Sequence, residues 1–461
     1  MSELRSLQDL LDSKPDLVEF YYNDARPWHA STAKGLPVPL AYSNWREEQL
    51  ATAETAALLH QTYILPALYL KGPDALKLLQ SIAVNGFSNY GHDRGKQFVA
   101  CSPSGHLIGD CILYRHGEER FELVSGAPVL NWVSYHAGKG GHDVELLLDE
   151  SINNNPTGRR VRYRFELCGP AAREIFARAI EGPLPDIRFF RTATVRMNGH
   201  DVMVLRHGMV GSYAVEFSGP FDEQEAVRDH ILAAGEAFGI KPMGIQAYYA
   251  GAHGGWIPYP VPGILSDPDT ADYRRHLPAH TFEAGYQLGG SFVGSDISDY
   301  YATPYDFGYG KIIRFDHDFF GREALENMPE EKKRKKVSLV WNHDDILRVL
   351  ASQFGKGPRY KAINFPTVSY AWKQCDEVRS KRGDLIGQSL GASYVSTYGE
   401  VVSMALLNSA EHAEIGSEVV ITWGEPNGGS RKPQVEPHEQ TTIRAKIGPV
   451  PYQQDIQRAS N

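Results

Sequence analysis

The chain alternates between short strand-like runs and single amphipathic helices, and it lacks the regular strand–helix–strand repeat of a parallel sheet. Residues 97–117 and 120–126 are rich in apolar residues and are punctuated by Gly, Ser and Pro, as antiparallel strands are. Residues 221–239 instead repeat apolar residues at helical spacing and end at Gly239. Strands and helices in this irregular order predict an α+β architecture.

The first 90 residues predict more helix than strand. Residues 3–21 have the pattern of one amphipathic helix, and a helical pattern returns over residues 44–61. A strand is expected over residues 67–72, and a helix that ends near residue 84 follows it.

A charged run separates this part from a β-rich remainder. Residues 330–337, EEKKRKKV, predict a solvated linker. The pieces KVSLVW, GEVVSMALL, SEVVITWG and TTIRAKIG then predict a C-terminal β-barrel or sandwich. We expect a catalytic region over residues 1–335, with two α+β subdomains of about 1–160 and 161–335, and a β domain over residues 337–461.

Composition excludes several classes of protein. The 461 residues hold 47 Lys and Arg against 56 Asp and Glu, a net charge of −9, which argues against a nucleic-acid binder. No uncharged apolar run approaches the ~18 residues of a membrane span, and the N-terminus lacks a signal-peptide pattern. The four cysteines are not in CxxC spacing and are typical of reduced thiols. We expect a cytoplasmic protein that needs neither a membrane nor nucleic acid.

The common catalytic motifs are missing from the sequence. It contains no GxGxxG behind a strand, no P-loop, no HExxH and no GxSxG. Residues 315–318, FDHD, are the one tempting metal cluster, but the sequence identifies no third ligand. We therefore predict no metal.

Five stretches, taken in order, resemble the folate-binding aminomethyltransferase family, which includes the T-protein of the glycine cleavage system. They are residues 68–87, 102–114, 211–220, 307–325 and 403–424. The resemblance implies a ring of three domains with folate in the central channel. The first two domains would be α+β and the last a β-barrel.

A closer resemblance is to one branch of that family, the tetrahydrofolate-dependent O-demethylases of methoxylated aromatic acids such as vanillate and syringate. YSNWREEQ, NWVSYHA, GGSFVGSDISDYY and GEPNGGSRKPQVEPHEQ look like that branch nearly word for word. The resemblance implies that N5 of tetrahydrofolate attacks the ether methyl group. The enzyme would align the two reactants and protonate the departing phenoxide, without a metal or an obligatory protein partner.

The branch assigns the acid role to a tyrosine whose match is Tyr248 in GIQAYYAGAHGGW. Tyr249 is the rival, because a shift of one residue in the match exchanges the two. The aminomethyltransferases have an Arg-Asp motif at this place, which the present chain lacks. Asp110 matches their catalytic aspartate, although Gly109 could equally be the matching position.

The resemblance also implies the residues that hold the folate. Glu216 would accept two N–H bonds from the amino-pyrimidine edge of the pterin. Gln97 would offer an amide, Val124 a backbone and apolar wall, and Trp256 a stacking face.

The substrate pocket is where the chain departs from vanillate-type relatives. Their GRAP motif has an arginine where this chain has Gly126, and their paired histidines after a Gln-Thr pair are replaced by Tyr63 and Ile64 after Gln61. An arginine suits a substrate carboxylate. Together the two changes predict a methoxybenzoate without a free hydroxyl, or with its carboxylate elsewhere on the ring, and dicamba is one possibility. Arg26 or His29 would then bind the carboxylate.

Two other functions compete with this prediction. One is aminomethyl transfer or folate-dependent demethylation of an amine, which the missing Arg-Asp motif disfavours. The other is a non-catalytic folate-binding protein of the iron–sulfur assembly type, which the absence of a reactive Cys motif disfavours.

Overall fold

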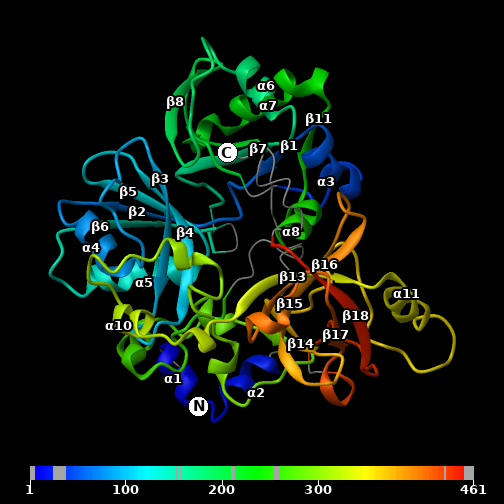
Figure 1. The fold of residues 1–461 in the computed structure, drawn as a ribbon. Coiled ribbons are helices and arrows are strands. Elements are labelled where there is room, and N and C mark those ends of the chain that lie inside the picture. Colours follow the sequence, from blue (N-terminus) through cyan, green and yellow to red (C-terminus); the bar gives the residue numbers. More distant parts are fainter. Residues whose placement is uncertain are drawn as a thin grey trace.

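The computed structural model describes most of the chain: residues 6–23, 38–151, 154–155, 157–208, 213–253, 260–429 and 432–450. Figure 1 shows three lobes around a common middle, with a helix-covered sheet at the top, a second sheet at the left and a β-barrel at the lower right. The predicted α+β class with a C-terminal barrel is confirmed.

The first lobe is a six-stranded sheet in the order β11-β1-β7-β10-β9-β8. Only β1 and β11 pair in parallel, and the other neighbours are antiparallel. Helices α6 and α7 bury their apolar sides against one face of the sheet. The elements are β1 (Ala56–His60), β7 (Arg162–Cys168), α6 (Ala172–Ala179), β8 (Thr192–Met197), β9 (His200–Leu205), β10 (Ala214–Pro220), α7 (Gln224–Gly235) and β11 (Ile240–Met243).

The second lobe is a five-stranded antiparallel sheet in the order β3-β4-β5-β2-β6. Helices α4 and α5 share its hydrophobic core. The elements are β2 (Ala67–Lys71), α4 (Ala75–Ile82), β3 (Gly95–Cys101), β4 (Leu107–Arg115), β5 (Arg120–Val124), α5 (Ala127–Gly138) and β6 (Glu145–Asp149).

The third lobe is a six-stranded barrel in the order β14-β15-β16-β13-β18-β17, closed by pairing between β14 and β17. Trp341, Trp423 and Ile443 fill its interior. The elements are β12 (Leu288–Gly289), which pairs in parallel with β14, then β13 (Lys335–Trp341), α11 (His343–Ala351), β14 (Lys373–Arg379), β15 (Leu385–Val395), β16 (Glu400–Leu407), β17 (Glu418–Trp423) and β18 (Thr441–Gly448).

Short helices connect the lobes. The α-helices are α1 (Leu7–Asp12), α2 (Leu17–Tyr22), α3 (Trp45–Glu54), α8 (Ile245–His253), α9 (Ala271–His276) and α10 (Arg322–Glu326). The 3₁₀ turns are η2 (Phe221–Glu223), η3 (Glu236–Phe238), η4 (Pro268–Thr270), η5 (Glu283–Gly285), η6 (Ile297–Tyr300), η7 (Tyr309–Lys311), η8 (Glu330–Lys332), η9 (Ala410–His412) and η10 (Pro426–Gly428). Among them, α8 contacts both α3 of the first lobe and β15 of the barrel.

Two predicted helices are wrong in extent. The single helix over residues 3–21 is two helices, because Pro15 interrupts the first and the Asp16 side chain caps the second by accepting from the Glu19 amide at 2.9 Å. The helix over residues 44–61 ends at Glu54, and residues 56–60 form β1. All five residues of β1 are buried between β11 and β7, so pairing in the sheet overrides the helical pattern.

The solvated linker predicted over residues 330–337 is also wrong in part. Residues 330–332 form η8 and β13 begins at Lys335, where it pairs with β16. Residues 333–336 are half-buried. The domain boundaries near residues 160 and 335 stay a prediction. The first sheet takes β1 from before residue 160 and its other strands from after it.

Candidate active site

One face of the first sheet carries charged residues toward the middle of the molecule. Phe165 and Phe217 belong to the core beneath α6 and α7, so strand alternation turns Arg164, Glu166 and Glu216 to the opposite face. Glu216 of β10 and Glu166 of β7 lie directly opposite each other in register. This face is therefore polar at its centre although both of these carboxylates are buried.

Glu216 is held from three sides. The Tyr114 hydroxyl donates to its Oε2 at 2.7 Å, His207 Nδ1 lies 3.0 Å from its Oε1, and Arg164 lies 3.6 Å from Oε2. Burial opposes ionisation of Glu216, but His207, Arg164 and Tyr114 together lower its pKa. Burial likewise opposes protonation of His207, yet its hydrogen bond to Glu216 and the charge there raise its pKa. The carboxylate is thus fixed in place as an anion.

Arg164 connects this carboxylate with the second lobe. Its guanidinium donates to Glu122 of β5 at 2.9 Å and to the Tyr114 hydroxyl at 2.8 Å. His116 Nε2 lies 2.7 Å from the other Glu122 oxygen. Burial would raise the pKa of Glu122, but Arg164 and His116 hold it well below its usual range. The two sheets are therefore joined by a buried network of charged groups.

Gln97, Asp110 and Val124 come together on one face of the second sheet. Ile112 pairs with both Gln97 of β3 and Val124 of β5, and Asp110 lies two residues from Ile112 on β4. The Gln97 amide donates to Asp110 Oδ2 at 2.5 Å. Tyr114, the partner of Glu216, is on the same face of β4. The structure thus brings three predicted folate and catalytic residues to the face of the second sheet that carries Tyr114.

Burial raises the pKa of Asp110, and this outweighs a hydrogen bond from the Tyr309 hydroxyl, the charge of Lys336 and the Gln97 bond. Burial and the neighbouring Asp110 in turn raise the pKa of Tyr309. Tyr309 of η7 and Lys336 of β13 come from outside the second sheet. The site around Asp110 is therefore built from two lobes.

Tyr248 and Tyr249 follow each other on α8. Tyr248 is 7% exposed and belongs to an apolar cluster with Leu59, Cys168 and Ala214. Ala214 precedes Glu216 by two residues on β10, so Tyr248 packs over the same face of the first sheet. Tyr249 is half-buried, with its ring centroid 5.5 Å from that of Tyr248. The assignment of Tyr248 as the acid stays a prediction.

The three predicted substrate-binding residues that follow β1 lie in different surroundings. Gln61 is buried and donates to Glu166 Oε2 at 3.0 Å, which places its amide on the charged face. The Tyr63 hydroxyl instead donates to Gln224 of α7 at 3.1 Å, away from that face. Ile64 packs against the apolar clusters of both Tyr248 and Tyr63. Gln61 and Ile64 therefore lie nearer the predicted chemistry than the Tyr63 hydroxyl does.

Gly126 begins α5 at the end of β5. The preceding Ser125 hydroxyl donates to the backbone carbonyl of Asp110, so Gly126 adjoins the Asp110 site. Its φ of −66° is ordinary, and an added Cβ would meet only Pro128 Cδ, at 3.8 Å. The remaining candidates Arg26, His29 and Trp256 lie outside the described residues.

Comparison with known proteins identifies the family of the chain. The GCVT N-terminal domain model matches residues 24–250. The chain is 40% identical over 449 residues to a syringate O-demethylase of Sphingobium sp. (strain NBRC 103272 / SYK-6), with 97% of this chain and 96% of that protein covered. The chain belongs to the GCVT family. Its resemblance to the O-demethylase branch, expected from the motifs, is confirmed.

Two further relatives fit this family. A sesamin methylene transferase of Sinomonas sp. (strain No.22) is 31% identical over 437 residues, with 90% of each chain covered. The glycine cleavage system aminomethyltransferase T from Bartonella henselae has a TM-score of 0.57 at 17% identity, covering 90% of this chain and 91% of that one. The latter likeness shows the fold, and the predicted T-protein-like architecture is confirmed.

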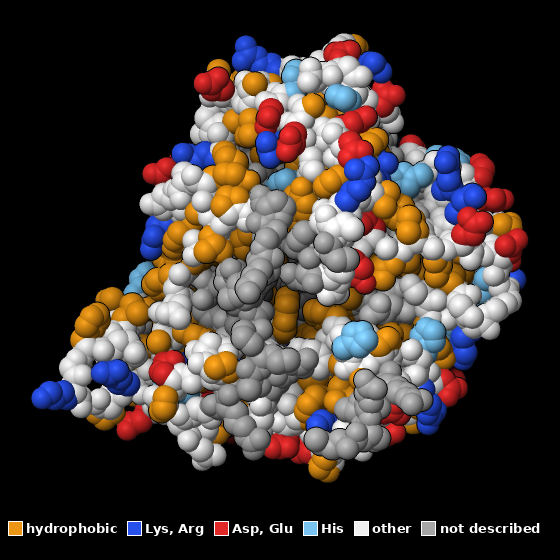
Figure 2. All heavy atoms as spheres, turned by 180° about the vertical axis from the view of Figure 1, so that it is seen from behind, with side chains coloured by type: hydrophobic (Ala, Val, Ile, Leu, Met, Phe, Trp, Pro, Cys, Tyr) orange, Lys and Arg blue, Asp and Glu red, His pale blue; other side chains and the backbone are white. Residues whose placement is uncertain are grey.

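Sequence reasoning missed Arg164, Glu122, Tyr114 and Tyr309. Arg164 and Glu166 alternate with apolar residues in RYRFELC, a pattern that more often marks a solvent-exposed face. In this GCVT-family chain that face is covered by the second lobe. Seen from behind, charged side chains gather toward the rim of the molecule, while hydrophobic ones border its middle (Figure 2).

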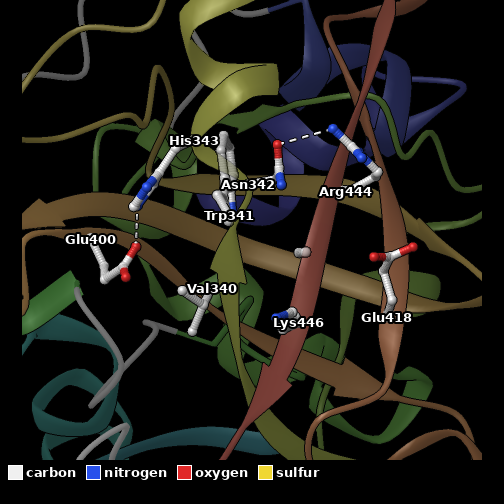
Figure 3. Close-up of a pocket in the computed structure, with 9 residues that line it drawn as sticks. Val340, Trp341, Asn342, His343, Glu400, Glu418, Arg444 and Lys446 are labelled. Carbon is white, nitrogen blue, oxygen red and sulfur yellow. Dashed lines mark hydrogen bonds and ion pairs between the residues drawn. The ribbon is translucent and has the colours of Figure 1, made fainter.

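A separate hollow of about 170 Å³ lies on the outside of the barrel (Figure 3). Within its lining, His343 Nε2 lies 2.5 Å from Glu400, and Arg444 donates to the Asn342 side-chain oxygen at 3.1 Å. The lining does not include any predicted site residue. The hollow is therefore separate from the residues of the candidate active site.

In the described part of the chain, no three His, Cys, Asp or Glu side chains gather to hold a metal ion. Both ring nitrogens of His317 in the FDHD run contact protein oxygens, Asp316 Oδ1 and the Ala83 carbonyl, each at 2.9 Å. All four cysteines are buried and free. None of the described helices is long and apolar enough to cross a bilayer.

Proposed function

We propose that the chain is a tetrahydrofolate-dependent O-demethylase of a methoxylated aromatic acid. The single observation that carries this proposal is 40% identity to a syringate O-demethylase over nearly the full length of both chains. In the reaction, the bond between the ether oxygen and the methyl carbon breaks and a bond from folate N5 to that carbon forms. N5 loses its proton and the phenoxide gains one, giving 5-methyl-tetrahydrofolate and a hydroxylated aromatic.

Glu216 is the proposed anchor of the pterin. Its two oxygens contact His207 and Tyr114, one each, and a carboxylate has about four acceptor positions. The Glu216 carboxylate therefore still has acceptor positions for two N–H groups from the amino-pyrimidine edge of the pterin. The lowered pKa of Glu216 keeps it anionic, which strengthens both bonds. Gln97 and Val124 would contact the same ring from the second lobe.

Tyr248 is the proposed general acid. A phenol matches the proton affinity of the phenoxide that leaves, and a positioned acid contributes roughly 10²–10⁴-fold in rate. Asp110 is the proposed acceptor of the N5 proton, because its raised pKa gives it more affinity for a proton than an exposed carboxylate has. Alignment of the methyl group between the ether oxygen and N5 would supply the remaining rate acceleration.

The substrate side of the site favours a methoxybenzoate without a free phenol hydroxyl. Ile64 is apolar and packs beside Tyr248, and the Tyr63 hydroxyl is bonded to Gln224. Gly126 offers no cation for a carboxylate. An ortho-methoxybenzoate of the dicamba type fits this description, with Arg26 or His29 as proposed partners of its carboxylate.

The test is an anaerobic turnover assay with tetrahydrofolate and a panel of vanillate, syringate, 3-O-methylgallate, ortho-methoxybenzoate and dicamba. Formation of 5-methyl-tetrahydrofolate in equal amount to a demethylated acid supports the proposal and ranks the substrates. If tetrahydrofolate binds and every ether in the panel is inert, the proposal fails.

The likeness to a sesamin methylene transferase favours one further substrate class, methylenedioxybenzenes. Transfer of a methylene bridge would give methylene-tetrahydrofolate and a catechol instead of 5-methyl-tetrahydrofolate and a phenol. A methylenedioxybenzoate added to the same panel distinguishes the two reactions by the folate product.

A further inference from the structure

Lys336 lies in the charged run that the sequence presents as a linker. On β13, Val337 and Leu339 point into the barrel, so alternation turns Lys336 to the outside of the barrel. Its neighbour Lys335 pairs with Glu330 at 3.3 Å near solvent. Lys336 itself is half-buried, with Nζ 5.9 Å from the centroid of the Phe307 ring. The ammonium group is thus directed toward the segment that leads into η7.

This segment and β4 place Lys336 beside the candidate active site. Phe307 precedes Tyr309 by two residues, and Tyr309 is a neighbour of Asp110 that affects its pKa. Burial lowers the pKa of Lys336 to about 8, and attraction to Asp110 opposes this shift. Lys336 and Asp110 nevertheless both keep part of their surface accessible. Groups that are desolvated and still accessible are typical of the wall of a concave site.

We propose that Lys336 supplies a cation that binds a ligand carboxylate in the active site. This inference rests on the proposed function. A carboxylate bound next to Asp110 would be repelled by it, and a half-buried ammonium between the two anions removes that repulsion. Two ligands of the reaction carry carboxylates: the aromatic acid and the glutamate tail of tetrahydrofolate.

The test compares ligands with and without the carboxylate in Lys336→Met. KM is measured for a methoxybenzoate and for the same methoxybenzene without its carboxylate, and for tetrahydrofolate and tetrahydropteroate, which lacks the glutamate. Loss of one charge-assisted bond raises the KM of the responsible acid about 10- to 100-fold and leaves its neutral analogue unchanged. The pair that shows this difference identifies the source of the carboxylate.

Two further variants make the result specific. Lys336→Arg keeps the charge and restores most of the lost affinity. Lys335→Met removes the adjacent charge, which is bonded to Glu330, and leaves every KM unchanged. If Lys336→Met changes acids and neutral analogues equally, or changes neither, the inference is overturned.

A failure of the proposed function can be distinguished from a failure of this inference. If the wild-type chain turns over no ether, binding of tetrahydrofolate and tetrahydropteroate to wild type and Lys336→Met is measured by calorimetry. Selective loss of tetrahydrofolate affinity supports Lys336 as a carboxylate-binding residue, and equal affinities overturn it.

Discussion

Two buried acids in this molecule are neutralised in different ways. In the barrel, Lys361 Nζ lies 2.6 Å from Glu425 Oε1, and neither side chain has any exposed surface. Between the two sheets, Glu216 lies 3.6 Å from Arg164 and takes its shortest hydrogen bond, 2.7 Å, from the Tyr114 hydroxyl. The barrel acid is in direct contact with a lysine ammonium group. The central acid is held by a network that orients it and leaves acceptor positions for a ligand.

The barrel pair has contacts that suit a structural role. The Gly290 amide donates to Glu425 at 3.1 Å, and Lys361 Nζ lies 4.7 and 4.9 Å from the Tyr370 and Trp423 ring centroids. Gly290 directly follows β12, so the pair ties the preceding segment to the barrel. We therefore expect substitutions in the barrel pair to change stability, and substitutions around Glu216 to change activity.

The largest expected effect is on activity. Tyr248→Phe removes the proposed acid and keeps the ring that packs with Leu59 and Ala214, so kcat should fall roughly 10²- to 10⁴-fold with little change in unfolding midpoint. Tyr249→Phe is the matched control and should retain most of kcat. Steady-state kinetics with tetrahydrofolate decide the assignment, and the opposite ranking would transfer the acid role to Tyr249.

The next effect is on stability alone. Lys361→Met leaves Glu425 as a buried carboxylate without its cation, which should reduce the free energy of unfolding by about 3–5 kcal/mol. Denaturant unfolding followed by circular dichroism measures this loss. Lys381→Met, on an exposed side chain of the same barrel, should leave the midpoint nearly unchanged. Equal midpoints for the two variants would contradict a structural role for the barrel pair.

Glu216→Gln should affect ligand binding and spare the fold. The amide keeps an oxygen for Tyr114, and Arg164 remains paired with Glu122 at 2.9 Å. The dissociation constant for tetrahydrofolate should rise about 10- to 100-fold, since two charge-assisted bonds become weaker. Fluorescence titration measures it, with exposed Glu118→Gln as control. A large loss of stability with unchanged folate affinity would show that Glu216, like Glu425, has a structural role and does not bind folate.

Local patterns in the sequence predict part of this arrangement. The helix over residues 221–239 ends as expected at Gly239, whose φ of 71° lies in the left-handed region that glycine adopts most easily. The β3–β4 hairpin and β10 also match their strand patterns. Motif resemblance places Gln97, Asp110 and Glu216, and the structure brings them to one region.

The parts that could not be predicted depend on contacts between distant segments. Tyr114 and Glu216 are 102 positions apart and meet only when two sheets pack face to face. Residues 56–60 follow a helical pattern, but pairing of β1 on both sides makes them a strand. The local sequence around Lys336 predicts a linker, but pairing of β13 with β16 makes the residue part of a strand. In each case the partner, and not the local sequence, decides the structure.

Gly126→Arg tests whether the central region accepts a new charge that a packed core would reject. The position has open space around its Cβ and begins a helix, so the fold should tolerate the side chain. One added charge-assisted pair with a substrate carboxylate should raise kcat/KM for vanillate about tenfold. Gly126→Met, of similar length without charge, should give no gain. Equal activity of the two variants on vanillate would show that a side chain at position 126 does not bind the substrate carboxylate.

The smallest expected effect is a pH dependence of stability from His207 and Glu216. The pKa of His207 is raised from 6.5, so its stabilisation is full below that pH and is lost as pH rises through the folded-state pKa. The pKa of Glu216 is lowered from 4.5, so its stabilisation is present above that pH and is lost as pH falls through the folded-state pKa. The pair therefore stabilises most between pH 4.5 and 6.5. His207→Asn should flatten the decline above pH 6.5 in unfolding measurements, and an unchanged profile would show that His207 only positions Glu216.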